Sequence, residues 1–235
     1  MSISRSLLLR CGALLAGGLF LCGPGTAPAA QTQSAPQAVV ESFDSDLLAA
    51  MRQAGSVGPK GRFDILAPSV ARAFDMNAMT ERMLKARWSH LTEEQKGRLA
   101  AAFGRFEAAQ YAAWFDTFTG QSFQVGAAHP APGGGTAVPS TMSGGGGPAL
   151  ALEYIVAEEE GGWKIVDIRY NGWMSDVERR ASEFNAILTR SGVDALVARL
   201  DAVGQSVLAR GDNRAAPHLL QSRIELWSVP LPAID

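Results

Sequence analysis

The chain has 235 residues, of which 47% are hydrophobic and 19% are charged, and its formal net charge is −2. This composition is typical of a globular protein with enough apolar material for one domain, with or without a small helical annex. The near-neutral charge does not favour nucleic acid or an anionic membrane surface as a partner. The sequence contains no uninterrupted apolar run of about 18 residues that would span a bilayer.

The first 30 residues are predicted to be a signal peptide. Arg5 and Arg10 form a basic start, a short apolar segment follows at 11–22, and small residues at 27–29 suit a cleavage site. An uncleaved anchor is the alternative, but the apolar segment is short for a spanning helix. Both cysteines lie in this segment, so the mature chain would contain no disulfide, thiolate metal site or cysteine nucleophile. The expected location is the periplasm.

The next part of the chain, 36–118, is predicted to be helical. Apolar residues recur at helical spacing over 36–54 and over 62–73, and the glycine-containing segment 55–59 should end the first helix. Asp75 is suited to cap a third helix, whose inward face would carry methionines.

The helix predicted at 92–118 organises the rest of the chain. Thr92 and Gln95 have the spacing of a capping box. Two apolar stripes follow: Leu99, Phe103 and Phe106 on one, and Gly104, Ala108, Tyr111, Phe115 and Phe118 on the other. A helix that is apolar on two faces needs protein on both sides, or protein on one side and an apolar ligand on the other. The second stripe passes from small residues to aromatic ones, which favours a cavity; a central core helix is the alternative.

After residue 120 the pattern changes to strands and then returns to helix. An antiparallel meander is predicted from four strands at 121–127, 136–143, 149–158 and 163–170, followed by helices at 174–190 and 193–208 with a break at Gly192. In the helix at 174–190, Val177 and Phe184 are expected to face inward, and Asp176, Glu178, Arg179, Arg180 and Glu183 outward. The segment 211–235 is expected to be an irregular tail, either disordered or laid over an apolar groove.

No group of residues indicates an enzyme, a cofactor or a metal site. The three histidines are far apart in sequence, and no HExxH, GxSxG or phosphate-loop motif is present. Asp167 is unusual because it lies in an otherwise apolar strand. It is interpreted either as a buried general base or as a carboxylate paired with Lys164, Arg169 or a helix N-terminus.

Four segments, in this order and spacing, resemble the MlaC family of periplasmic lipid-binding proteins, also called the toluene tolerance family. They are Phe103–Tyr111 (FxxFxxxxY), Gly120–Val125, Trp163–Gly172 and Ser191–Leu200. The stretch 57–79 is similar to the hopanoid-associated HpnM branch of that family. The resemblance covers roughly 36–208, whereas the glycine-rich hairpin at 133–147 and the tail do not match.

The resemblance implies an NTF2-like α+β fold at 31–210, with a curved four-stranded antiparallel sheet wrapped by helices and a helical subdomain. It also implies a monomeric shuttle that carries phospholipid, hopanoid or both across the periplasm and supports outer-membrane lipid asymmetry. Its partners would be an inner-membrane MCE-domain/ABC transporter complex and an outer-membrane lipoprotein complex.

Physical chemistry agrees with a carrier, because exposing roughly 30 methylenes of a lipid to water costs about 24 kcal/mol. A helix apolar on two faces, set against an apolar strand face, would supply the cavity. The lipid-binding residues are expected to be Phe103, Gly104, Phe106, Ala108, Tyr111, Phe115, Val125, Leu152, Tyr154 and Ile168. Two alternatives remain: an NTF2-like enzyme acting on a hydrophobic substrate through Asp167 or Tyr154, and a periplasmic interaction module with a filled core.

Overall fold

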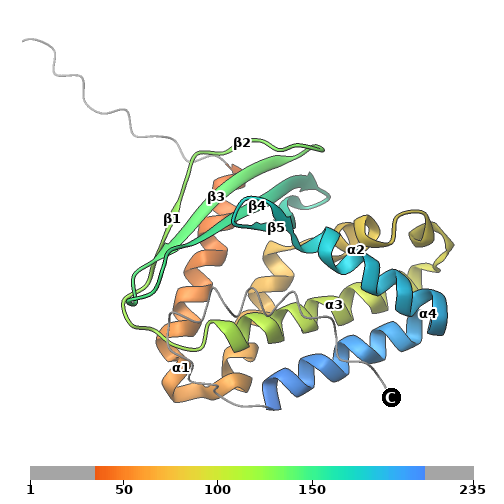
Figure 1. The fold of residues 1–235 in the computed structure, drawn as a ribbon, viewed down its shortest axis with the longest axis horizontal. Helices are drawn as coiled ribbons and strands as arrows, with labels where there is room; N and C mark the ends of the chain where they lie inside the picture. The colour runs from red at the N-terminus through yellow and green to blue at the C-terminus, as the bar shows by residue number, and fades with distance from the viewer. Residues whose placement is uncertain (1–34, 210–235) are drawn as a thin grey trace, which may run out of the picture. The chain divides into compact units, whose positions relative to one another are not determined.

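The computed structural model describes residues 35–209 (Figure 1), and the expected signal peptide and C-terminal tail lie outside the described residues. Helices precede and follow an antiparallel sheet, as predicted for an α+β fold. The elements are α1 (Ala35–Ala73), α2 (Met76–Leu84), the 3-10 helix η1 (Lys85–His90), α3 (Glu93–Trp114), β1 (Ser122–Val125), β2 (His129–Pro130), β3 (Thr136–Ser143), β4 (Leu150–Glu159), β5 (Gly162–Tyr170), β6 (Met174–Ser175) and α4 (Asp176–Ala209).

Helix α1 consists of two arms that meet at Gly58. This residue has φ 64° and ψ −176°, a conformation that glycine adopts without a steric penalty. The break predicted at 55–59 is therefore confirmed, and Pro59 follows at the first position of the second arm, where proline is tolerated. The first arm (35–57) and the second arm (59–73) lie side by side, because Arg72 of the second arm pairs with Asp46 of the first.

Helix α3 begins with the predicted capping box. The Gln95 amide donates to the Thr92 hydroxyl at 3.2 Å, and the Thr92 amide donates to the Gln95 side chain at 2.9 Å. The helix ends at Trp114 rather than at 118, because Phe115 leaves the helical conformation while its amide still donates to the Tyr111 carbonyl. Helix α3 contacts α1 and α2 as well as α4, so both of its apolar stripes meet protein.

The sheet has the order β1-β3-β4-β5-β6, all pairs antiparallel, and β2 also pairs with β3. The four predicted strands correspond to β1, β3, β4 and β5, and the two-residue strands β2 and β6 are additions. The register between β4 and β5 shifts between Ile155 and Val156. Because Val166 is then an extra residue, Ile165 and Ile168 both face the helices despite their odd spacing.

The main apolar core lies between the helices and one face of this sheet, and α1 is the helix that contacts most of its strands. A smaller apolar cluster of Ala137, Ile155 and Val166 lies on the other face.

Helix α4 is kinked at Gly192, which has φ 81°, so the predicted break there is confirmed. No helix within 35–209 is long and apolar enough to cross a membrane.

The prediction that Asp176 and Arg180 face outward is wrong, since both are almost fully buried. Arg180 pairs with Asp176 and also with Glu107 of α3, so its charge is not buried alone.

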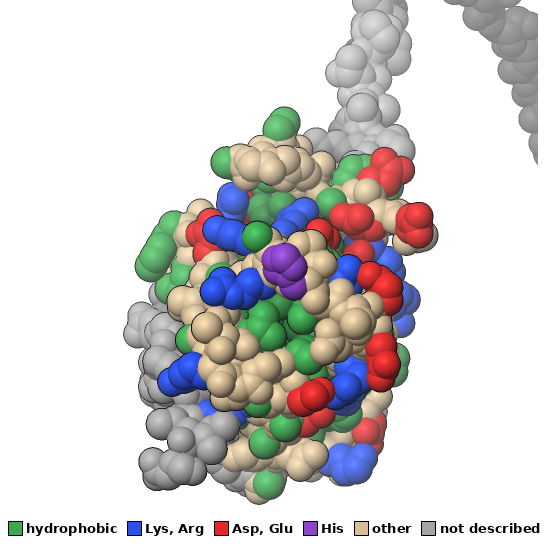
Figure 2. All heavy atoms as spheres, turned by 90° about the vertical axis from the view of Figure 1, so that its right-hand side faces the viewer, with side chains coloured by type: hydrophobic (Ala, Val, Ile, Leu, Met, Phe, Trp, Pro, Cys, Tyr) green, Lys and Arg blue, Asp and Glu red, His purple; other side chains and the backbone are tan. Residues whose placement is uncertain are grey.

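The face of the molecule in Figure 2 carries Lys and Arg side chains interspersed with Asp and Glu side chains. That face presents no charge field of a single sign.

Candidate functional site

The residues predicted to bind lipid all belong to the apolar interior or pack against its edge. Gly104 and Val125 are partly buried. The others are buried core residues: Phe103, Phe106, Ala108, Tyr111, Phe115, Leu152, Tyr154 and Ile168. The fold thus brings α3 and the inner face of the sheet into one apolar cluster.

The two stripes of α3 nevertheless have different neighbours. Phe103 lies edge-on to Phe184 of α4 with ring centroids 5.6 Å apart, and the Arg180 guanidinium lies 4.6 Å from the Phe106 ring centroid. Tyr111, from the second stripe, instead contacts Phe43 of α1. The first stripe therefore packs on α4, while the second faces Met76 of α2 at Gly104 and Phe43 of α1 at Tyr111.

Phe43 connects the second stripe to the sheet and was not among the predicted site residues. Its ring is edge-on to Phe74, Tyr111 and Tyr154, at centroid distances of 4.9, 5.2 and 6.2 Å. The helical spacing of Val40, Phe43 and Leu47 indicates an inward position, but it does not indicate which ring would occupy the centre of the aromatic group. This information comes only from the tertiary contacts.

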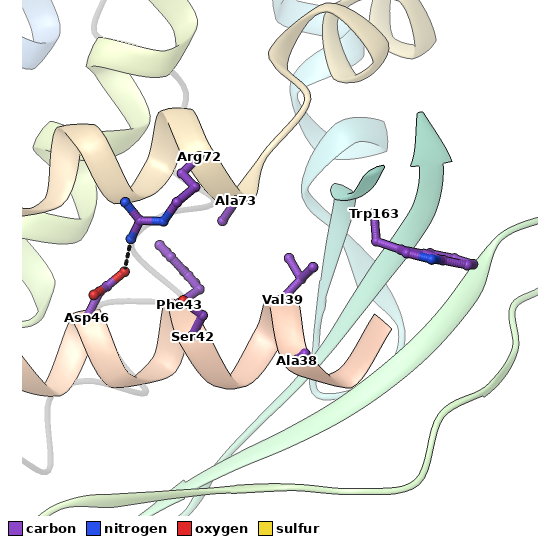
Figure 3. A pocket seen from close by; sticks show the side chains of 8 residues that line it. All are labelled: Ala38, Val39, Ser42, Phe43, Asp46, Arg72, Ala73 and Trp163. Carbon is purple, nitrogen blue, oxygen red and sulfur yellow. Dashed lines mark hydrogen bonds and ion pairs between the residues drawn. The ribbon is translucent and has the colours of Figure 1, made fainter. Parts of the chain in front are cut away.

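A pocket of about 300 Å³ lies between the two arms of α1, with Trp163 of β5 at one end (Figure 3). This volume is at the lower limit for small-molecule sites, which is about 300 Å³. Phe43 is fully buried and forms part of the pocket wall. The complete lining is Ala38, Val39, Ser42, Phe43, Asp46, Arg72, Ala73 and Trp163, none of which was predicted as a site residue.

A charged pair bridges the two arms at this pocket. The Arg72 guanidinium contacts the Asp46 carboxylate at 2.5 Å, and the two side chains are 58% and 31% exposed. The Lys164 ammonium donates to the Arg72 carbonyl, which ties the end of the second arm to β5. Apolar side chains and a solvent-accessible guanidinium therefore occur together, as an amphiphilic ligand would require.

Beside Phe43, Asp44 is buried and faces the sheet. Its carboxylate accepts hydrogen bonds from the hydroxyls of Ser140 at 2.6 Å and Tyr154 at 3.1 Å. Burial raises the pKa of Asp44 to about 7, although the two hydrogen bonds act in the opposite direction. Sequence reasoning missed this residue, and the available signal was an acidic residue on an apolar helical stripe.

Asp167 is a helix-capping residue. It accepts hydrogen bonds from the Ser175 hydroxyl at 2.6 Å and from the backbone amides of Val177 and Ile168. Burial raises the pKa of Asp167, and these hydrogen bonds oppose that effect. The interpretation as a carboxylate at a helix N-terminus is confirmed. Asp167 pairs in register with Ile155, so it projects on the opposite sheet face from Tyr154 and the main core.

A second buried polar group joins α3 to α4. Arg180 contacts Glu107 at 3.0 Å and both Asp176 carboxylate oxygens at 3.1 Å. Burial raises the pKa of Glu107, while the adjacent guanidinium opposes the rise. Arg180 thus has two acidic partners in the interior, which suits a structural tie better than a reaction centre. Within the described residues, no three His, Cys, Asp or Glu side chains gather as a metal site would require.

These observations define the class of protein: an α+β domain in which helices and one sheet face enclose an apolar interior, with a pocket at its edge. The MlaC protein family model matches residues 41–202, a range that includes both the helices and the sheet. The chain belongs to the MlaC family.

A solved structure has a similar fold. It is a phospholipid-binding protein from Ralstonia solanacearum in complex with a phospholipid, with a TM-score of 0.63 and 23% sequence identity. The similarity covers 74% of this chain and 99% of that chain. A comparison with curated proteins gives no match.

Proposed function

We propose that the protein is a periplasmic lipid carrier, the shuttle of an Mla-like ABC transport system that moves phospholipid, hopanoid or both between the inner and outer membranes. The observation that carries this proposal is membership of the MlaC family over 41–202. The fold shared with a protein solved with bound phospholipid supports it. MlaC family proteins act in the periplasm, which agrees with the signal peptide expected at 1–30.

The interior supplies the physical basis for carrying lipid. A lipid leaving a membrane needs an apolar environment in place of the bilayer, since hydrating its tails costs about 0.8 kcal/mol per methylene. The proposed tail contacts are the predicted residues of the second α3 stripe and of the sheet face: Gly104, Ala108, Tyr111, Phe115, Val125, Leu152, Tyr154 and Ile168. Phe103 and Phe106 would form the wall behind them, because they pack on α4.

The pocket between the arms of α1 is the proposed point at which tails enter. Phe43 separates that pocket from Tyr111 and Tyr154, so displacing its ring would join the pocket to the interior. Arg72, at the pocket, would pair with the phosphate of a phospholipid head group in exchange for Asp46. Carrying lipid in this way requires the side chains only to bind, orient and exclude water.

Three further features belong to this proposal. The partners would be an inner-membrane MCE-domain/ABC transporter complex and an outer-membrane lipoprotein complex, with the carrier acting as a monomer. The cargo would include a hopanoid if the protein belongs to the HpnM branch. The mature domain would span 31–210.

The second candidate is an interaction module with a filled core, and the close packing of the Phe43 aromatic group favours it. Mass spectrometry of organic extracts from gently purified protein separates the two. The carrier yields a stoichiometric phospholipid or hopanoid, and stripped protein takes lipid up again from vesicles. If the extract contains no lipid and vesicles supply none, the carrier proposal is wrong. Chemical turnover of the bound lipid, abolished in Asp167→Asn, would instead indicate an enzyme.

A further inference from the structure

The hydroxyl of Tyr111 is a buried polar group with no hydrogen-bond partner among the described residues. The residue is only 4% exposed, and on α3 it faces Phe43 of α1. Buried hydroxyls without a partner are rare, since each loses its bonds to water and gains nothing in return. A group of this kind indicates a missing partner.

Within residues 35–209, the neighbours of the Tyr111 ring are mainly aromatic side chains. Its ring is encircled by four aromatic rings at centroid distances between 5.2 and 6.2 Å: Phe43, Phe74, Trp114 and Phe115. The nearby carboxylates are already occupied, Asp44 by Ser140 and Tyr154, and Glu107 by Arg180. Burial raises the pKa of Tyr111 well above its ordinary value, so the phenol keeps its proton and remains a donor.

The position of Tyr111 relative to the pocket indicates where the partner comes from. Phe43 forms part of the pocket wall, and the ring of Tyr111 lies directly behind it. A ligand that displaces the Phe43 ring would come into contact with the aromatic group that contains Tyr111. The donor therefore lies in an aromatic group that contacts the pocket wall through Phe43.

We propose that the Tyr111 hydroxyl donates a hydrogen bond to an acyl-ester carbonyl oxygen of the bound lipid, and so makes the site selective for ester-linked lipids. This inference rests on the proposed lipid-carrying function. A carbonyl oxygen suits the site because it is an acceptor only, and a single O–H donor satisfies it. A ligand hydroxyl would bring a second donor, and the two nearby carboxylates already face other groups, Asp44 the hydroxyls of Ser140 and Tyr154 and Glu107 the Arg180 guanidinium.

The test compares two phosphatidylcholines with identical chains, one ester-linked and one ether-linked, bound to lipid-stripped protein. A hydrogen bond of ordinary net strength gives wild type a preference of about three- to tenfold for the ester lipid. Tyr111→Phe removes one oxygen atom, so it should lose this preference and bind the ether lipid as wild type does. Ligand-free Tyr111→Phe should unfold at the same temperature or higher, since it loses no hydrogen bond.

Tyr170→Phe is the matched control, because it removes the same atom from another buried tyrosine, on β5, and should keep the ester preference. Retention of the preference in Tyr111→Phe, or equal loss of it in both variants, overturns the proposal. Wild type that binds both lipids without preference overturns it as well. Failure of wild type to bind either lipid overturns the proposed carrying of phospholipid itself, which is a separate result.

Discussion

The hydroxyl of Ser140, in the middle of β3, donates a 2.6 Å hydrogen bond to the buried carboxylate of Asp44 on the first arm of α1. Tyr154 of β4 donates to the second carboxylate oxygen. One acidic side chain thus ties the first arm of α1 to two adjacent strands of the sheet. The pocket borders the same arm of α1, so that arm can move away from the sheet only if these two hydrogen bonds break.

We predict that Asp44 makes the protein less stable as pH rises from about 4 to about 7. Its folded-state pKa of about 7 lies above the ordinary value of 3.8, so the folded state holds the proton more tightly than the unfolded state does. The stabilisation is complete below pH 4 and is lost as pH rises through 7, at up to about 1.4 kcal/mol per pH unit. Denaturant unfolding of wild type and Asp44→Asn across this range measures the difference. Identical pH profiles for the two proteins would contradict the prediction.

Phe43→Ala should open the pocket toward the interior. Removing a fully buried aromatic ring lowers the free energy of unfolding by about 3–5 kcal/mol, and it also removes the partition between the pocket and Tyr111. Uptake of a fluorescent phospholipid from vesicles should therefore become faster. Leu47→Ala is the control, because Leu47 is equally buried on the same arm but does not line the pocket. Equal acceleration in both variants would show that destabilisation alone is responsible.

Arg72→Gln should weaken binding of phospholipids without unfolding the protein. The Arg72–Asp46 pair is partly exposed, so its loss should change the free energy of unfolding by less than about 1 kcal/mol. Asp46→Asn should have the opposite effect on binding, since it frees the guanidinium for a phosphate. Affinities for a phospholipid and for a neutral diacylglycerol, measured at low and high salt, test both variants. Equal changes for the two lipids would exclude a phosphate contact.

Glu107→Gln should be more destabilising than the loss of an exposed pair between the same two helices. It removes one of the two acidic partners of a fully buried guanidinium, and an imperfectly paired buried polar group costs about 1–3 kcal/mol. The control is Arg98→Gln, which breaks the exposed pair with Asp194 and should cost less than about 1 kcal/mol. Chemical denaturation of both variants gives the comparison. Similar losses would mean that the buried pair adds little beyond the surface pair.

The features that could be predicted from sequence are those with local causes. The capping box at Thr92 and the helix breaks at Gly58 and Gly192 depend on residues within one or two helical turns. They can therefore be predicted from the local sequence. The four long strands were predicted for the same reason, since alternation and turn residues lie within each hairpin.

The features that were missed depend on partners far away in the chain. The charges of Asp176 and Arg180 predict surface positions, whereas the pairing of Arg180 with Glu107 on α3 is not visible in the sequence. Phe43 and Asp44 acquire their roles from Tyr111, Ser140 and Tyr154, about 70 to 110 residues later. The register shift opposite Val166 is also a property of two strands together.

The kink at Gly58 has a consequence for the order of folding. Because the chain reverses there, seven of the eight residues that line the pocket come from α1 alone. Contacts between neighbouring helical segments close short loops and form early, whereas pairing of distant strands is slow. The two long walls of the pocket can thus assemble as a helical hairpin before any strand is in place, and Trp163 of β5 joins them last.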